Sequence, residues 1–379
     1  MGKKILYIYG GLYSPNGMSS MISQKINYLA ENTDHEMYVV LTEHPERKMF
    51  YKLSDKVKRK DIVINFDDLD TMPFLKKLFF YWIKQRRFKK FLADYMMEIR
   101  ADITVSITRR EINFINKIPD GSKKIAEIHF ARTFYRQFNK RYLPQFVNRC
   151  ISKIWMNGLI RNLSLLDRFI VLTQEDRQNW SELNNVIVIP NFVSSVPEKK
   201  SNLTNKVVIA VGRYSYQKGF DMLIDAWKKV YRQHPDWNLE IYGVGDNESY
   251  QAIADNYGLS NVVHCKTAVA NIFDYYANSS FFVLSSRYEG LPLVIIEAMG
   301  AGLPVVSFAC PCGPNDIIEN GVNGMLVENG NVAKLADTIS YLIEHDAERL
   351  LMGRNALSSI SKFQKESIML KWIELFDSL

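Results

Sequence analysis

Short apolar segments rich in β-branched and aromatic residues alternate with helical stretches along almost the whole chain. Strands are expected at residues 3–10, 36–43, 101–108, 123–130, 168–173, 206–213, 237–245, 281–286 and 303–308. Stretches such as 17–31 and 220–234 between them have helical character. Apolar strands separated by helices are typical of parallel sheets that are connected by right-handed crossovers. The sequence therefore predicts an α/β protein with doubly wound sheets.

The alternating pattern breaks off and restarts once, in a segment at residues 189–202 that contains two prolines and several serines and lysines. Such a composition is typical of a linker. The 379 residues of the chain are enough for two or three domains. We therefore predict two doubly wound domains in tandem. Their ligands are expected beyond the carboxyl ends of the strands, in a cleft between the two domains.

The charge of the chain is unevenly distributed, although the whole carries a net charge of +7. Residues 1–192 hold 32 Lys and Arg against 20 Asp and Glu, whereas residues 193–379 hold 16 against 21. This asymmetry predicts an anionic partner for the first domain. No apolar run is as long as the roughly 20 residues of a membrane span, and the N-terminus is interpreted as a strand instead of a signal peptide. Four cysteines without metal-ligand spacing are consistent with the reducing cytoplasm.

Two basic residues follow the first strand of the second domain, in the segment VGRYSYQKG at residues 211–219. Arg213 and Lys218 lie in a loop that leads into a helix beginning near Phe220. Two cations beside the free amides of a helix N-terminus form an anion site that suits a diphosphate. The alternative is a basic loop that only faces solvent.

Two carboxylates stand in the otherwise apolar segment SSRYEGLPLVIIEAMGAGLPVVSF at residues 285–308. Pro292 favours a helix from about 292 to 300, which places Glu289 above a strand end and Glu297 within a buried helix. The backbone amides of three residues are expected to point to the same place: Gly290, Leu291 and Leu293. Carboxylates accept hydrogen bonds from hydroxyls, so a diphosphate flanked by two polyols would satisfy the whole set. The sequence thus predicts a nucleotide-sugar, with the ribose on Glu297 and the sugar on Glu289; a buried ion pair at Glu297 is the alternative.

The stretch EGLPLVIIE resembles the E-x7-E signature of the family 4 retaining glycosyltransferases, and VGRYSYQKGFD, IPNFV, LPVVSF and GPNDIIENGVNGMLV follow the order of that family. The resemblance covers nearly the whole chain and is strongest over residues 206–330. It implies the GT-B fold, in which two Rossmann-like domains face each other across a cleft and a C-terminal helix crosses back to the first domain. The expected boundaries are 1–190 plus 363–379 for the acceptor domain and 191–362 for the donor domain.

The resemblance also implies a function. The protein is expected to be a hexosyltransferase without a metal or other cofactor, which moves a hexose or N-acetylhexosamine from a nucleotide-diphosphate sugar to a hydroxyl of a lipid-linked or cell-surface glycan. In this interpretation Arg213 and Lys218 hold the diphosphate, Glu289 the donor sugar and Glu297 the ribose. The segment CPCGPNDIIENG is similar to members that use UDP-sugars for bacterial surface polysaccharide biosynthesis. A nucleotide-sugar epimerase of the same fold and a non-catalytic nucleotide-sugar-binding subunit are the alternatives.

The first domain offers two further candidate positions. Gly17, in the glycine-rich loop after the first strand, maps to the family position over the donor phosphates, with Ser19 as a further contact in place of a missing basic residue. A purely structural turn is the alternative. His129 follows the strand at 123–128, where the family places a histidine near sugar and acceptor, so it is a candidate catalytic group or a structural histidine. Its neighbour Glu127 is expected to face away.

Residues 71–97 combine a basic run with interleaved aromatic residues, which predicts either two helices or one bent helix. Basic amphipathic helices dock on anionic membrane surfaces. The candidate membrane or acceptor surface consists of Lys76, Lys77, Trp82, Lys84, Arg86, Arg87, Lys89 and Lys90. We therefore predict a cytoplasmic protein that binds the inner face of the cell membrane peripherally. Packing of this helix on its own core is the alternative, and a nucleic acid partner is not expected.

The segment DDLD at residues 67–70 is similar to the metal-binding DxD motif of a different glycosyltransferase fold. It lies in a polar loop without the sequence context of that fold. We interpret it as a turn or a helix cap, and no metal site is predicted.

Overall fold

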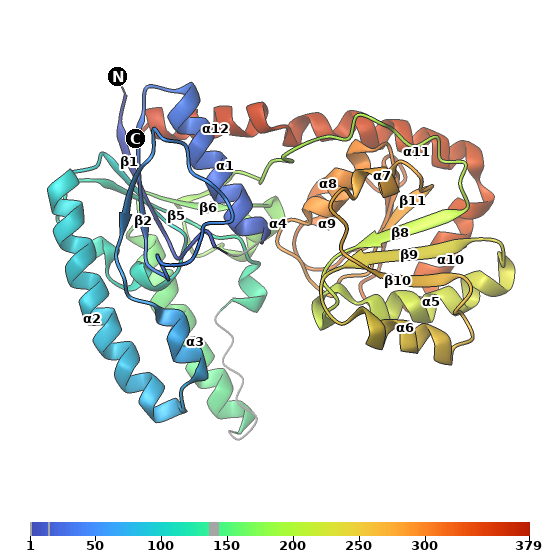
Figure 1. Ribbon diagram of the computed structural model, residues 1–379, viewed down its shortest axis with the longest axis horizontal. Helices are drawn as coiled ribbons and strands as arrows, with labels where there is room; N and C mark the ends of the chain where they lie inside the picture. The colour runs from blue at the N-terminus through green and yellow to red at the C-terminus, as the bar shows by residue number, and fades with distance from the viewer. Residues whose placement is uncertain (1, 14–15, 136–143) are drawn as a thin grey trace. The chain divides into compact units, whose positions relative to one another are not determined.

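The computed structural model describes residues 2–13, 16–135 and 144–379. The chain divides into two compact units (Figure 1). Unit 1 comprises Met1–Val171, Arg177–Ile189 and Met369–Leu379, and unit 2 comprises Leu172–Asp176 and Pro190–Ile368. Each unit contains one parallel sheet, and the C-terminal residues belong to unit 1. The predicted fold class of two doubly wound α/β domains is therefore confirmed.

Unit 1 contains a seven-stranded parallel sheet with the strand order β3-β2-β1-β4-β5-β6-β7. Its strands are β1 (Lys4–Tyr9), β2 (Glu36–Leu41), β3 (Lys58–Asp61), β4 (Ile103–Ser106), β5 (Lys123–Glu127), β6 (Arg168–Val171) and β7 (Val186–Val188). Its helices are α1 (Gly17–Asn32), α2 (Phe74–Ile99), α3 (Gln145–Ser164), the second half of α4 (Gln174–Asn179) and most of α12 (Lys365–Asp377). The direction of the chain order reverses between β1 and β4, so ligands are expected beyond the ends of these two strands.

Unit 2 contains a six-stranded parallel sheet with the order β10-β9-β8-β11-β12-β13. Its strands are β8 (Val207–Val211), β9 (Asn238–Gly243), β10 (Val263–Thr267), β11 (Phe281–Leu284), β12 (Val305–Phe308) and β13 (Gly324–Val327). Its helices are α5 (Phe220–Gln233), α6 (Asn247–Asn256), α7 (Phe273–Tyr276), α8 (Leu293–Gly300), α9 (Pro314–Ile317), α10 (Val332–Glu344) and α11 (Asp346–Ser359). Here the order reverses between β8 and β11.

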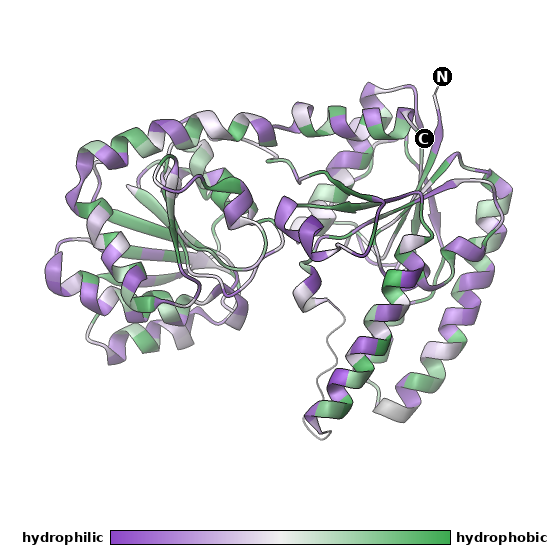
Figure 2. Cartoon of the chain, turned by 180° about the vertical axis from the view of Figure 1, so that it is seen from behind, coloured by the Kyte–Doolittle hydropathy of each residue, from purple (hydrophilic) through white to green (hydrophobic). Residues whose placement is uncertain are grey.

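Successive side chains of each inner strand point to opposite faces of the sheet, and helices cover both faces. In β1, Leu6 and Ile8 pack in one cluster with residues of α2 and α3, whereas Tyr7 lies 5.5 Å from the Lys25 ammonium of α1. Figure 2 shows hydrophobic residues along the strands and mixed colours along the helices. This pattern is the reason that the inner strands could be predicted from apolar runs.

Two expectations about secondary structure need correction. Residues 74–99 form a single 26-residue helix, α2, so of the two alternatives for this segment the one with two separate helices is wrong. Strands β3, β7, β10 and β13 were not among the expected strands. All four residues of β3 are exposed, because it is an edge strand, and its sequence KRKD has no apolar signal.

Candidate functional site

The loops after β8 and β11 meet at the switch point of the unit 2 sheet and are joined by hydrogen bonds. The Ser285 hydroxyl donates to the carbonyl of Lys218 at 3.0 Å, and the Gln217 amide donates to the carbonyl of Tyr288 at 3.0 Å. Gly219 makes this approach possible. Its φ is +62°, and a Cβ there would lie 2.1 Å from the Ser285 carbonyl oxygen.

The joined loops bring two of the predicted donor-binding residues together. The Lys218 ammonium lies 2.7 Å from Glu289 Oε1, and both side chains are largely buried. The Ser286 hydroxyl donates to the same carboxylate oxygen at 2.6 Å. The predicted diphosphate cation and the predicted sugar-binding carboxylate are thus neighbours, although they are 71 residues apart in sequence. Ser286 was not singled out from the sequence.

Glu297 lies on α8, where it is partly buried among apolar residues. Within the described residues, no hydrogen bond or ion pair to its carboxylate is present. Burial raises the pKa of Glu297 to about 6, and the positive charge of Lys218 opposes this rise. The nearby Tyr276 hydroxyl is buried, and its hydrogen-bonding capacity is also unsatisfied in the described structure. A carboxylate that has no protein donor is suited to accept hydrogen bonds from ligand hydroxyls.

The remaining predicted donor residues of unit 2 lie in the same two loops and at the start of α8. Arg213 is exposed, and its guanidinium is 3.5 Å from the Gln217 side-chain oxygen. Leu293 is the first residue of α8, so this helix begins one residue later than expected, and Pro292 is its N-cap. Gly313 packs on this loop, since a Cβ at Gly313 would lie 3.1 Å from the Gly290 carbonyl oxygen. Gly313 opens the segment GPNDIIENGVNGMLV, but its packing against this loop was not predicted.

Gly17 is the first residue of α1, which follows the loop at the end of β1. A Cβ on Gly17 would meet no atom of the described residues within 4 Å, so among these residues nothing covers the backbone at this helix end. The expected contact through Ser19 is wrong. Ser19 is fully buried, and its hydroxyl lies 2.8 Å from that of Tyr9.

His129 belongs to a buried chain of charged groups in unit 1. Its Nε2 lies 3.3 Å from Glu127 Oε1, and Glu127 also forms a buried ion pair with Lys25 of α1. The Lys25 ammonium is 3.9 Å from the ring of Trp372 in α12. The expectation that Glu127 faces away from His129 is therefore wrong. Residues two positions apart in an extended segment point to the same side.

This arrangement determines what each nitrogen of His129 can do. Burial would raise the pKa of Glu127, but Lys25 and His129 together hold it well below its usual value, so the carboxylate is ionised. An ionised carboxylate accepts a hydrogen bond, which favours a proton on Nε2 of His129. The other nitrogen, Nδ1, is buried and has no partner in the described structure. It is available as a hydrogen-bond acceptor.

A cavity of about 840 Å³ adjoins His129 in unit 1. Its walls come from the segments after β4 and β5 and from the N-terminal halves of α2 and α3. Most of its lining side chains are apolar, among them Leu78, Tyr81, Ile151 and Trp155. The charged lining residues are Arg109, Arg110, Lys77 and Asp70. Neither the cavity nor Arg109 was predicted, because the lining residues are far apart in the sequence.

The candidate membrane surface lies on α2, but its residues differ in environment. Trp82 is 52% exposed, and Lys76, Arg86, Arg87, Lys89 and Lys90 are exposed as well. Lys77 and Lys84 instead pair with Asp70 and Asp68, at 2.7 and 3.1 Å. Helices with the length and apolar character needed to cross a bilayer are absent from the described part of the chain. The C-terminal half of α2 packs on the core through Phe88, Leu92 and Met96.

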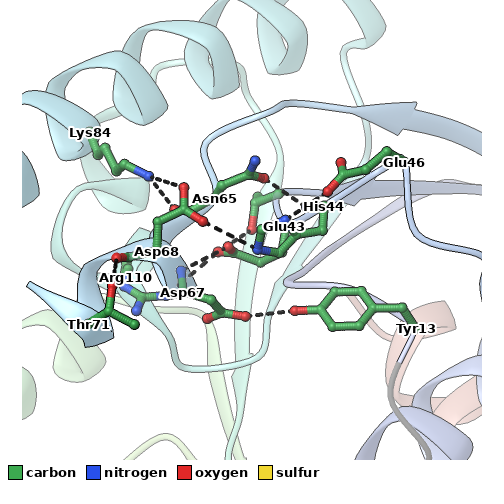
Figure 3. Close-up of polar contacts among 11 residues, drawn as sticks. Tyr13, Glu43, His44, Glu46, Asn65, Asp67, Asp68, Thr71, Lys84 and Arg110 are labelled. Atoms are coloured by element: carbon green, nitrogen blue, oxygen red, sulfur yellow. Dashed lines mark hydrogen bonds and ion pairs between the residues drawn. The ribbon is translucent and has the colours of Figure 1, made fainter.

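The DDLD segment forms a short 3-10 helix, η1 (Phe66–Thr71), in agreement with the predicted turn. Asp67 lies near Glu43 and His44, and ligand atoms of the three residues are within 4.8 Å of one another (Figure 3). Tyr13 donates to Asp67 at 2.6 Å, and Arg110 lies 3.8 Å from Glu43. The neighbouring protein donors therefore already satisfy the two carboxylates, and the contacts connect the segment after β2 to η1.

Comparison with known proteins places this chain in a family. The family model of the group 1 glycosyl transferases matches residues 194–358, which include Lys218, Glu289 and Glu297. An uncharacterized glycosyltransferase of Haemophilus influenzae is 33% identical over 376 residues, which cover 98% of this chain and 99% of that protein. The chain belongs to the group 1 glycosyl transferases. The predicted family and enzyme class are thus confirmed.

Two more similarities extend over most of the chain. An N,N'-diacetylbacillosaminyl-diphospho-undecaprenol alpha-1,3-N-acetylgalactosaminyltransferase of Campylobacter jejuni is 23% identical over 364 residues, 90% of this chain and 91% of its own length. A solved structure of S. aureus TarM, a mutant in complex with fondaparinux, alpha-GlcNAc-glycerol and UDP, superimposes with a TM-score of 0.72 at 19% identity, and 99% of each chain is covered. The second similarity confirms the fold.

Proposed function

We propose that this glycosyltransferase is a retaining, metal-independent enzyme that transfers a hexose or N-acetylhexosamine from a UDP-sugar to a hydroxyl of a lipid-linked surface glycan. The observation that carries the proposal is Glu297, a partly buried carboxylate to which no described residue donates a hydrogen bond, beside the Lys218–Glu289 pair. Ribose hydroxyls would supply the missing donors to Glu297. The S. aureus structure, which holds UDP, and the Campylobacter enzyme, whose name gives a diphospho-undecaprenol acceptor, support the choice of donor and acceptor.

In the proposed mechanism, Lys218 and Arg213 stabilise the charge that develops on the leaving diphosphate. Removal of one such group should lower turnover by about 10² to 10³. Glu289 accepts hydrogen bonds from the donor sugar when Lys218 turns to the phosphates. No side chain is assigned as a covalent nucleophile, so attack by the acceptor on the same face as the leaving group accounts for retention. The leaving phosphate takes the proton of the acceptor hydroxyl.

The test is incubation of the protein with UDP-hexoses, with and without a lipid-phosphate acceptor, followed by NMR of the anomeric centre. The proposal predicts an α-linked product only when the acceptor is present, and equal activity after treatment with EDTA. An epimerised sugar without acceptor would instead identify an isomerase. Binding of the UDP-sugar without any product would identify a non-catalytic subunit, and inversion at the anomeric carbon would refute retention.

We also propose that α2 places the protein on the cytoplasmic face of an anionic membrane. The triple variant Arg86→Glu, Lys89→Glu, Lys90→Glu should abolish sedimentation with anionic vesicles, since each basic residue near the surface contributes about 1 kcal/mol. The matched control changes three exposed basic residues of unit 2: Arg232→Glu, Lys334→Glu, Arg354→Glu. Both variants lose the same charge. Equal sedimentation of the two would refute a specific role of α2.

A further inference from the structure

We propose that the α2–α3 cavity of unit 1 is a binding site for a long-chain isoprenoid phosphate, the carrier part of the acceptor. The inference rests on the proposed function and adds the site and the chemical class of the acceptor carrier. Three independent features of the cavity support it: its apolar walls, the cation Arg109 and the unsatisfied nitrogen of His129.

The first feature is the apolar surface that the two helices present. The N-terminal parts of α2 and α3 project beyond the sheet of unit 1 (Figures 1 and 2). Both carry exposed large apolar side chains, namely Leu78, Phe79, Trp82, Phe146, Ile154 and Trp155, which are 50 to 73% exposed. Leu78 and Trp155 line the cavity, together with the partly buried Tyr81 and Ile151. A volume of about 840 Å³ is in the range of pockets for small molecules.

The second feature is the charge at the sheet edge. Arg109 follows β4 at the switch point of the unit 1 sheet and is partly buried. No carboxylate pairs with its guanidinium among the described residues, whereas Arg110 lies near Glu43 and Lys77 pairs with Asp70. A planar guanidinium without a carboxylate partner is suited to a phosphate.

The third feature is His129, whose buried Nδ1 has no partner in the described structure. A hydroxyl of the sugar attached to the lipid phosphate would donate to this nitrogen. The cavity therefore offers an acceptor for a hydroxyl, a cation for a phosphate and apolar walls for a hydrocarbon chain. A water-soluble glycan would leave the apolar walls unused, so these features together favour a lipid carrier.

The experiment measures binding of farnesyl phosphate to the full chain, with farnesol and inorganic phosphate as comparison ligands, in the absence of vesicles. We expect farnesyl phosphate to bind and Arg109→Gln to weaken it by at least about ten-fold, with little effect on farnesol. Leu78→Glu should weaken both farnesyl ligands by at least about ten-fold. The matched control is Phe79→Glu, which changes a neighbouring exposed residue that does not line the cavity, and it should stay within about two-fold.

Equal effects of Leu78→Glu and Phe79→Glu would overturn the proposal, because they would indicate binding to the general apolar surface. Equal affinity for farnesol and farnesyl phosphate would overturn the role of Arg109. Binding of a UDP-hexose is measured in parallel by thermal shift. Donor binding without farnesyl phosphate binding would refute this inference and leave the proposed function standing. Lipid binding without any binding of UDP-sugars would refute the proposed function instead.

Discussion

The raised pKa of Glu297 makes the substitution Glu297→Gln a test that separates function from stability. In the folded protein its pKa is about 6, against 4.5 for the unperturbed group. The folded state therefore binds this proton more tightly, so the cost of ionising Glu297 is absent below pH 4.5 and fully present above pH 6. The difference corresponds to about 2 kcal/mol at neutral pH. Gln has nearly the same shape and avoids this cost.

We therefore expect Glu297→Gln to be more stable than the wild type at pH 8, by up to about 2 kcal/mol, which is a rise in Tm of roughly 4 to 8 °C for a unit of this size. At pH 4.5 the two proteins should have nearly the same Tm. The variant should also lose most of the thermal shift that UDP-sugars produce in the wild type. Calorimetry across this pH range measures the first effect, and titration with UDP-hexoses the second.

The control is Glu289→Gln, which breaks the ion pair with Lys218 and should lower the Tm at pH 8. If Glu297→Gln were also destabilised, equally at pH 8 and pH 4.5, Glu297 would have a protein partner. The interpretation of this residue as a ligand for hydroxyl groups would then be wrong.

Three further predictions concern the framework of the two sites. Lys25→Met removes the ion-pair partner of the buried Glu127 carboxylate and should lower the free energy of unfolding, measured with urea, by about 3 to 5 kcal/mol. The double variant Lys25→Met, Glu127→Gln should recover most of this loss. No recovery would show that the two residues are not coupled. Because the pKa of Glu127 is lowered on folding, its contribution to the free energy of unfolding is complete above about pH 4.5 and falls as pH decreases. The wild type should therefore lose more stability than the double variant between pH 5 and 3. Parallel curves of stability against pH for the two proteins would contradict this. Gly219→Ala should lower both the Tm and the affinity for UDP-sugars, because the new Cβ would meet the Ser285 carbonyl. The control is Gly258→Ala, where φ is also positive (+71°) but a Cβ would meet no described atom within 4 Å; it should lower the Tm by less and leave binding intact. Equal effects of the two variants would refute the packing argument.

The sequence alone was sufficient for the fold class, because apolar strands and crossover helices are local patterns that do not depend on distant residues. It was also sufficient to select Lys218, Glu289 and Glu297, since each lies within one strand–loop–helix segment whose order along the chain is regular. Edge strand β3 escaped prediction because its residues are exposed and charged, so burial imposes no apolar pattern on them.

Only the tertiary structure showed which of these residues meet. Lys218 reaches Glu289 because Gly219 lets two loops that are distant in sequence approach each other, and Lys25 reaches Glu127 across 102 positions. The α2–α3 cavity is formed in the same way, by segments that the sheet and its helices bring together. Long-range contacts of this kind depend on strand order and packing, which a periodic pattern in one sequence does not encode. The sequence therefore determined most of the elements and the candidate residues, and the packing of the chain decided which side chains lie together.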